Sequence, residues 1–151
     1  MREGRLPLSF NREDALGPNG VCAKRPHAVV FVDDIASFEV SKYGPVFECA
    51  PAFPQKTNTE FVEVKSPTHL VMKVWERGAA ETLACGTGAC ALTVAAIIAG
   101  KTTERTCRVT LPGGDLEINW TTADSPDQGK VFMTGPATRV FGATVDPGYL
   151  V

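Results

Sequence analysis

The stretch WERGAAETLACGTGACALTVAAIIAG, residues 75–100, decides how we expect this chain to fold. It predicts a strand that ends near Trp75, then a Gly/Ala loop across residues 85–88, and then a helix. Between residues 89 and 99 nearly every side chain is apolar or small, and Gly100 stands where a helix C-terminus prefers glycine. A helix that is apolar on all sides must be buried on all sides, so we expect it at the centre of the core.

Strand signals lie on both sides of this helix. Runs of β-branched or alternating residues are separated by turn signals such as Ser66-Pro67-Thr68 and Pro112-Gly113-Gly114-Asp115. We also expect a short helix over about residues 40–49. The predicted strands occupy residues 6–10, 27–32, 61–65, 70–75, 108–111, 116–120, 131–134 and 138–145. The expected fold is therefore α+β, with a curled and mostly antiparallel sheet wrapped around one central apolar helix.

The composition fits one ordinary domain and excludes several functional classes. The chain has 151 residues, of which 44% are hydrophobic and 21% are charged. A net charge of −2 and a pI of about 5.7 give no reason to expect a nucleic-acid partner. No apolar run predicts a signal peptide or a membrane span.

Five cysteines stand at positions 22, 49, 85, 90 and 107, an odd number with no C-x-x-C spacing. Neither a disulfide framework nor a zinc site is therefore expected. Free thiols suit a reducing compartment, so we expect the cytoplasm, or the stroma of an organelle such as a plastid. Cys49, Cys90 and Cys107 lie in or beside apolar sequence and are expected to be buried and inert.

Cys85 is the candidate for a reactive cysteine, because it stands at the predicted start of the helix. The positive end of the helix macrodipole is expected to lower the pKa of its thiol and favour thiolate. Gly86 and Gly88 let a ligand approach backbone N–H groups that can hold a carboxylate or a developing enolate oxygen, and Thr87 adds a hydroxyl. These parts serve carbon-acid or nucleophilic thiol chemistry, and the residues alone leave an inert, buried cysteine equally open.

Several motifs resemble those of one enzyme family, the diaminopimelate epimerases. ERGAAETLACGTGACA (residues 76–91) resembles the second cysteine signature of that family. Pro26-His27 followed by AVVFVDD resembles its Asn-Pro-His strand, and FPQKTNTEFV (residues 53–62) resembles its Phe-Pro…Asn-(Val/Thr)-Glu-Phe-Val segment. LPGGDLEINW and VFMTGPATRVFGATV resemble its closing strands. The resemblance implies that residues 25–151 form an epimerase-like C-terminal domain, and we expect residues 1–24 to be a loose lead-in.

The resemblance implies a fold and a reaction. Members of the family are isomerases that interconvert LL- and meso-diaminopimelate, in lysine biosynthesis, without pyridoxal phosphate or metal. Their fold has two pseudo-symmetric halves, each a curled sheet around a central helix with a cysteine at the helix start. One thiolate removes the α-proton and the other cysteine, as a thiol, reprotonates the opposite face, because inversion needs a base and an acid on opposite sides of one carbon.

The resemblance also implies catalytic roles for particular residues. Cys85 would be the second of the two acid/base thiols, while Glu76 and His27 would lie near the reacting centre and tune or orient it. The structural alternatives are a solvated charge at a strand end for Glu76 and a hydrogen-bonded core histidine for His27. The resemblance implies no cofactor and no metal ligand.

Substrate binding is implied for four further residues. Gly86 and Thr87 would donate backbone N–H groups to the α-carboxylate. Asn58 and Arg77 would bind the distal end of the substrate, and the Arg77 guanidinium suits a bidentate contact with a carboxylate. An ordinary turn residue is the structural alternative for Asn58, and a solvated charge for Arg77.

Two substitutions and one absence depart from the family pattern. Arg25 stands where the family has a substrate-binding asparagine, and its cation would repel the distal ammonium of the substrate. Ala80 occupies the second position of a glycine-bearing loop that begins at Gly78, which is a milder change. The family's first half is missing, because the segment around Cys22 lacks the Cys-Gly-Asn-Gly motif. We therefore expect a truncated product, a fragment or one part of a split protein.

Three functions remain open. The first is an epimerase half that acts on a small amino acid with a complementary N-terminal half, so that little activity is expected of this chain alone. The second is a non-catalytic domain used for binding or assembly. The third is a related amino-acid racemase with altered specificity, such as one for proline or hydroxyproline. Self-association is also expected, because half of a cleft between two domains would be exposed.

Overall fold

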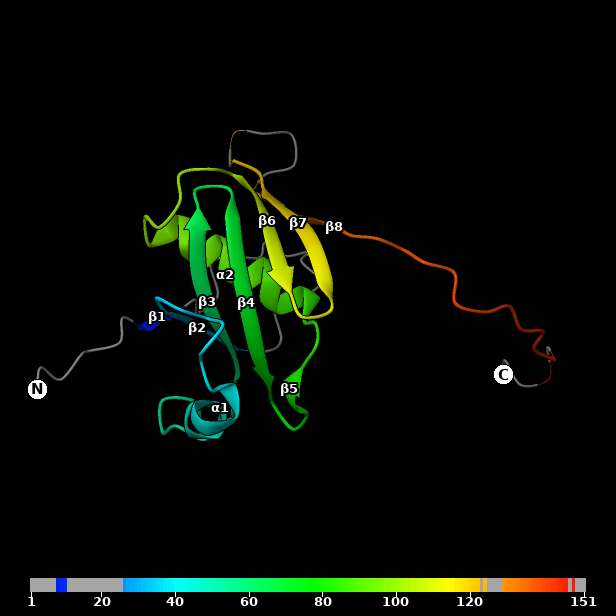
Figure 1. Cartoon of the computed structure of the whole chain (residues 1–151), viewed down its shortest axis with the longest axis horizontal. Coiled ribbons are helices and arrows are strands. Elements are labelled where there is room, and N and C mark those ends of the chain that lie inside the picture. The colour runs from blue at the N-terminus through cyan, green and yellow to red at the C-terminus, as the bar shows by residue number, and fades with distance from the viewer. Residues whose placement is uncertain (1–7, 11–25, 123, 125–128, 147, 149–151) are drawn as a thin grey trace, which may run out of the picture.

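The computed structural model describes residues 8–10, 26–122, 124, 129–146 and 148. These residues form one open sheet and two helices, which confirms the predicted α+β class (Figure 1). The helices are α1 (Val40–Glu48) and α2 (Gly86–Ile98). The strands are β1 (Leu8–Phe10), β2 (His27–Phe31), β3 (Asn58–Ser66), β4 (His69–Glu76), β5 (Ala80–Thr82), β6 (Thr106–Leu111), β7 (Gly114–Trp120) and β8 (Val131–Thr134).

The sheet is mostly antiparallel, as predicted. Its strand order is β1-β2-β3-β4-β6-β7-β8, and β5 pairs with β4 beside this path. Only the pairs β2–β3 and β4–β6 are parallel. A parallel pair cannot be joined by a tight turn and needs a crossover, and the two helices supply these crossovers. The predicted hairpins β3–β4 and β6–β7 are both present.

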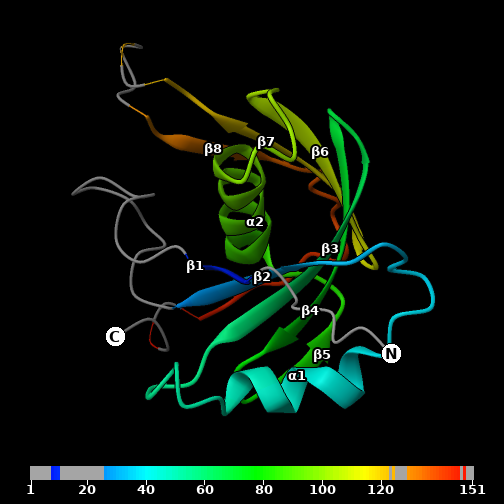
Figure 2. The ribbon, with the colours of Figure 1, turned by 90° about the vertical axis from the view of Figure 1, so that its left-hand side faces the viewer.

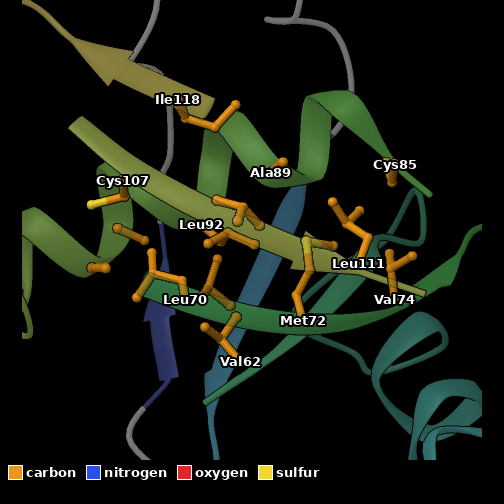
Figure 3. Close-up of a cluster of buried hydrophobic side chains, with 14 residues drawn as sticks. Val62, Leu70, Met72, Val74, Cys85, Ala89, Leu92, Cys107, Leu111 and Ile118 are labelled. Carbon is orange, nitrogen blue, oxygen red and sulfur yellow. The ribbon is translucent and has the colours of Figure 1, made fainter. Parts of the chain in front are cut away.

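Helix α2 lies in the concave side of the curled sheet, so its predicted place at the centre is confirmed (Figure 2). Leu92 on the helix packs with Val62, Leu70 and Ile118 of the surrounding strands, and all four side chains are fully buried (Figure 3). Burial of a leucine side chain of this kind contributes about 1.5–3 kcal/mol to the free energy of unfolding.

A second, smaller core lies on the other face of the sheet, beneath α1. Successive residues of a strand point to opposite faces. Val29 and Val62 therefore join the α2 core, while their neighbours Val30 and Phe61 pack beneath α1. Trp75 at the end of β4 is part of this second cluster, and its indole N–H donates to Glu48 over 2.7 Å. The sheet is thus covered on both faces at the end where β4 finishes.

Two expectations about α2 are wrong in detail. The Gly-Thr-Gly segment was expected in a loop, but the helix begins at Gly86, and Cys85 is its N-cap residue. Burial on all sides fails in the last turn, where Ile98 is 61% exposed. The curled sheet covers the helix along most of its length, and the final turn extends beyond it. Neither of the two described helices has the length and apolar character that crossing a membrane requires.

Other differences concern the ends of the sheet. The strand predicted at residues 138–145 is absent: residues 135–146 run away from the sheet, and Val140 and Phe141 are 86% and 78% exposed (Figure 1). The short strand β5 was not predicted. Cys49, expected to be buried, is exposed. Of the predicted lead-in, only residues 8–10 are described, and they form β1; Arg25 and Cys22 lie outside the described residues.

Candidate active site

The sheet brings three of the predicted site residues to one of its ends. His27 begins β2 and pairs in register with Asn58, which begins the parallel strand β3. Strand β4 runs antiparallel to β3, with Trp75 opposite Thr59, so its last residue, Glu76, finishes at the same end. Residues that are far apart in sequence therefore meet because of strand direction alone.

Cys85 is the N-cap residue of α2, and the first turn of that helix lies at this end of the sheet. Its backbone is extended, with φ −139° and ψ 100°, and its Sγ accepts a hydrogen bond from the N–H of Gly88 at 3.4 Å. The thiol thus takes the place of the hydroxyl that serine or threonine usually supplies at this position. The Thr87 hydroxyl lies 3.4 Å from the same sulfur atom. The first-turn N–H groups of a helix have no partner within it, so this end can receive an anion.

The predicted lowering of the Cys85 pKa is wrong. Burial raises the pKa of this thiol, because the side chain is only 6% exposed and a thiolate loses hydration there. The negative charges of Glu60 and Glu76 raise the pKa further, while the contacts with Thr87 and Gly88 oppose them. At neutral pH the residue is therefore a thiol in this structure, and the helix terminus does not make it a thiolate.

Asn58 and Arg77 are joined to each other. Asn58 is 3% exposed, and its Oδ1 accepts a hydrogen bond from the backbone N–H of Arg77 at 2.9 Å. The guanidinium of Arg77 donates to the carbonyl of Gln55 at 2.8 Å and is partly exposed. Asn58 thus lies in a strand, and it holds the start of the loop that carries Arg77. The turn that was considered for Asn58 is excluded.

Glu76 is also fixed by its neighbours. Its Oε1 accepts a 2.6 Å hydrogen bond from the Thr82 hydroxyl, which ties the end of β4 to β5. Gly78, in the connection between these strands, and Ala80, the first residue of β5, have φ values of 77° and 65°. This hairpin carries the chain from Glu76 toward Cys85, and the carboxylate lies close enough to raise the pKa of the thiol.

Glu60 belongs to this site, although the sequence analysis did not single it out. It is 0% exposed, and its Oε1 lies 2.7 Å from Nδ1 of His27. A Cβ on Gly88 would lie 2.6 Å from Oε1 of Glu60 and 3.2 Å from Sγ of Cys85. Only glycine at this position therefore lets the carboxyl and the thiol lie this close to the backbone of α2. The signal was present in the alternation of β3, where Glu60 and Val62 share the face that packs against α2.

The two remaining predicted residues lie in the first turn of α2. Gly86 is half-buried beneath Met133 of β8, whose sulfur would be 2.9 Å from a Cβ added there. Thr87 is exposed. All seven predicted site residues therefore lie at the sheet end beside the N-terminus of α2 or in the hairpin that leads to it. Among the described residues, no three His, Cys, Asp or Glu side chains are grouped as a metal ion would require.

Comparison with known proteins gives one consistent result. The family model for diaminopimelate epimerase matches residues 24–140. The diaminopimelate epimerase of Synechococcus elongatus is 52% identical over 121 residues, which are 80% of this chain and 41% of that protein. That of Microcystis aeruginosa is 56% identical over 136 residues, which are 90% of this chain and 46% of that protein. The chain thus spans less than half the length of these curated relatives.

Solved structures support the fold alone. A phenazine biosynthesis protein of the PhzF family from Enterococcus faecalis superposes with a TM-score of 0.53 at 16% sequence identity. The match covers 72% of this chain and 38% of that protein. A PhzF-family protein from Bacillus anthracis gives a TM-score of 0.52 at 19% identity, over 72% of this chain and 33% of that protein.

Proposed function

The chain belongs to the diaminopimelate epimerase family, and we propose that it carries one of the two proton-transferring sides of a cofactor-independent amino-acid epimerase. In this proposal residues 25–151 are the epimerase-like domain, and Cys85 is its acid/base group. The observation that carries the proposal is the place of Cys85 at the N-cap of α2, beside the sheet end that holds His27, Asn58 and Glu76.

Cys85 fits the step that gives a proton to the α-carbon. Burial and two nearby carboxylates keep its pKa high, so the resting group is a thiol and can act as the acid. In the opposite direction Cys85 must become a thiolate and remove the α-proton. The ammonium group of a bound amino acid would favour the thiolate, because its positive charge lowers the pKa of Cys85 and so counteracts the effect of Glu60 and Glu76.

The N-terminus of α2 would hold the α-carboxylate and stabilise the carbanion that forms. The N–H groups of Gly86 and Thr87 are in the first helical turn, where they have no partner within the helix. Such donors stabilise negative charge as it spreads from the α-carbon onto the carboxylate oxygens. The side chain of Cys85 lies beside these donors, which is the geometry that proton transfer at the α-carbon requires.

Arg77 would recognise the distal carboxylate of diaminopimelate. One of its guanidinium nitrogens is occupied by the carbonyl of Gln55, which leaves other donors of the fork for a ligand. Asn58 would contribute by fixing the backbone of Arg77. The effect of Arg25 on the distal ammonium stays a prediction, because Arg25 lies outside the described residues.

The opposite side of the α-carbon needs a second acid/base group. We propose that a complementary half supplies it, since one thiol cannot serve both faces of one carbon. Residues 135–146, with Val140 and Phe141 exposed, would be part of the surface that meets this half. For the location we propose the cytoplasm, or the plastid stroma in a photosynthetic eukaryote.

The test is interconversion of LL- and meso-diaminopimelate by this chain mixed with the N-terminal half of the Microcystis aeruginosa relative. Chiral chromatography measures the product, and each half alone is the control. We expect conversion only by the mixture. Conversion of proline or hydroxyproline in place of diaminopimelate would favour a racemase of altered specificity, which Arg25 makes the second candidate. If the halves bind each other but convert no amino acid, the chain is a binding domain and the proposal fails.

A further inference from the structure

Glu60 places an ionisable carboxyl in the core of the described residues. It lies on β3 inside the α2 core, and its side chain is fully buried. Transfer of an ionised carboxylate from water to such a place is costly unless partners compensate. Burial accordingly raises the pKa of Glu60 above its ordinary value, while the hydrogen bond with His27 acts in the opposite direction.

The partners of this carboxyl are few. Oε1 lies 2.7 Å from Nδ1 of His27, whose side chain is 8% exposed. Oε2 is buried and has no hydrogen-bond partner among the described residues. A buried polar atom without a partner is uncommon in native proteins and calls for an explanation. A methionine or leucine at this position would avoid the cost, so stability alone does not account for a glutamate.

We propose that Glu60 is a positioning residue that holds the His27 imidazole by its Nδ1 atom. A bond at one ring nitrogen fixes both the orientation and the tautomer of a histidine. With Nδ1 occupied by Glu60, any contact of this ring with a substrate or with a second acid/base group must be made through Nε2. The inference rests on the proposed function for its catalytic consequence, but the fixed ring is a property of this chain alone.

The position of Glu60 also connects the ring to the helix that carries Cys85. The carboxyl reaches the backbone of α2 at Gly88, where an added Cβ would be 2.6 Å from Oε1. The groups that face the carboxyl are His27 from β2, Cys85 at the start of α2 and Glu76 from β4. Glu60 thus lies between the His27 ring on β2 and the first turn of α2, which carries Cys85.

The test uses the ring ¹⁵N signals of the two histidines, His27 and His69, in the whole chain. His69 is the internal control, because it bonds to Thr110 on a different strand pair. In the wild type we expect one tautomer of His27, and in Glu60→Met a mixture of both. Glu60→Gln keeps an oxygen that can accept from Nδ1, so we expect it to restore the single tautomer. Unchanged His27 signals in Glu60→Met would overturn the proposal.

Activity with the complementary half supplies the second readout. We expect kcat to fall by about tenfold or more in Glu60→Met, with KM little changed and with partial recovery in Glu60→Gln. Urea unfolding separates this from a structural role, because an apolar residue of similar length should leave the fold at least as stable. If the ¹⁵N result holds and no preparation converts diaminopimelate, the proposed function fails while the role of Glu60 stands.

Discussion

The sulfur of Cys85 is held in a place that a hydroxyl usually occupies, and this determines how it reacts. Its hydrogen bond from Gly88 stabilises the helix start, while burial and two carboxylates oppose ionisation. A thiol of this kind is a poor nucleophile toward small reagents and a suitable proton donor. The geometry therefore favours carbon-acid chemistry over nucleophilic thiol chemistry, which the sequence alone left open.

Alkylation by iodoacetamide tests this view of Cys85. Because its pKa is raised above the ordinary 9.0, we expect it to react more slowly than the exposed Cys49 at pH 7. The Cys85 rate should continue to rise with pH above 9.0, as thiolate forms. Mass spectrometry of the digested protein measures both rates in one sample. Faster labelling of Cys85 than of Cys49 at pH 7 would contradict the account.

Glu60 gives a prediction about stability and pH. A carboxyl whose folded pKa is raised contributes stability that is fully present below the ordinary value of 4.5 and is lost as pH rises toward the raised pKa. Relative to wild type, Glu60→Gln should therefore gain unfolding free energy between about pH 4 and pH 7. Urea denaturation at both pH values measures this. The exposed Glu117→Gln is the control, with an expected difference within about 0.5 kcal/mol. A parallel course of wild type and Glu60→Gln would exclude the effect.

At the scale of single residues, motifs named side chains that lie close together in the fold, while their catalytic and binding roles stay predictions. Cys85, Glu76, Asn58 and His27 were each named, and the sheet brings the last three to one end. The pKa of Cys85 was predicted in the wrong direction, because the helix terminus was weighed without desolvation. Glu60 stands inside the quoted segment of residues 53–62, but its contact with His27 could not be predicted, because that contact depends on the pairing of β2 with β3.

At the scale of elements, the hairpin between β4 and β5 carries local strain. Ala80 has a φ of 65°, in the left-handed region where a Cβ costs about 1–2 kcal/mol. Ala80 pairs with Glu76 across this hairpin and follows Arg77 by three residues, so the strain affects the segment that presents both side chains. The substitution by alanine, judged mild from the sequence, falls at a position whose backbone favours glycine.

Ala80→Gly should stabilise the chain by up to about 1 kcal/mol, because the relief of strain exceeds the added entropy of the unfolded chain. The matched control is Ala79→Gly at the adjacent position, which has no positive φ and should lose about 0.5–1 kcal/mol. Chemical denaturation of the wild type, Ala80→Gly and Ala79→Gly measures the three free energies of unfolding. Equal losses in both variants would show that Ala80 is unstrained.

Most elements were predictable because their signals are local. Alternating runs and turn residues predicted β3, β4, β6 and β7, and the apolar run predicted α2. Residues 138–145 have the composition of a strand, yet they form none, because composition alone does not determine whether a segment pairs with a neighbouring strand. Strand β5 has only three residues, too few for an alternating pattern to show, and it was therefore not predicted. It pairs with β4, the strand that precedes it in the chain.

At the scale of the whole molecule, an apolar surface remains exposed. Val140, Phe141 and Val145 are 86%, 78% and 56% exposed on the segment that leaves β8. Leu83, just before Cys85, is 71% exposed. Binding of another protein at these positions would remove exposed apolar side chains from water. The proposed complementary half and self-association would both cover such a surface.

We therefore expect the isolated chain to self-associate as its concentration rises, and Val140→Glu/Phe141→Glu to weaken this association. The charges oppose burial of the segment against a second copy. Sedimentation velocity over a wide concentration range measures the effect. Ile98→Glu, at the exposed end of α2, is the control and should have less influence. A wild-type chain that stays a monodisperse monomer throughout would contradict the expectation.

The central claim is that Cys85 transfers the proton at the α-carbon, and exchange of that proton in deuterated water tests it most directly. NMR follows LL- and meso-diaminopimelate separately, with this chain and the complementary half present. Cys90→Ala, on the same helix, is the control and should exchange both isomers normally. Cys85→Ala should lose exchange of the isomer whose α-proton faces this chain, by about a hundredfold or more. Exchange of both isomers at the wild-type rate in Cys85→Ala would contradict the account.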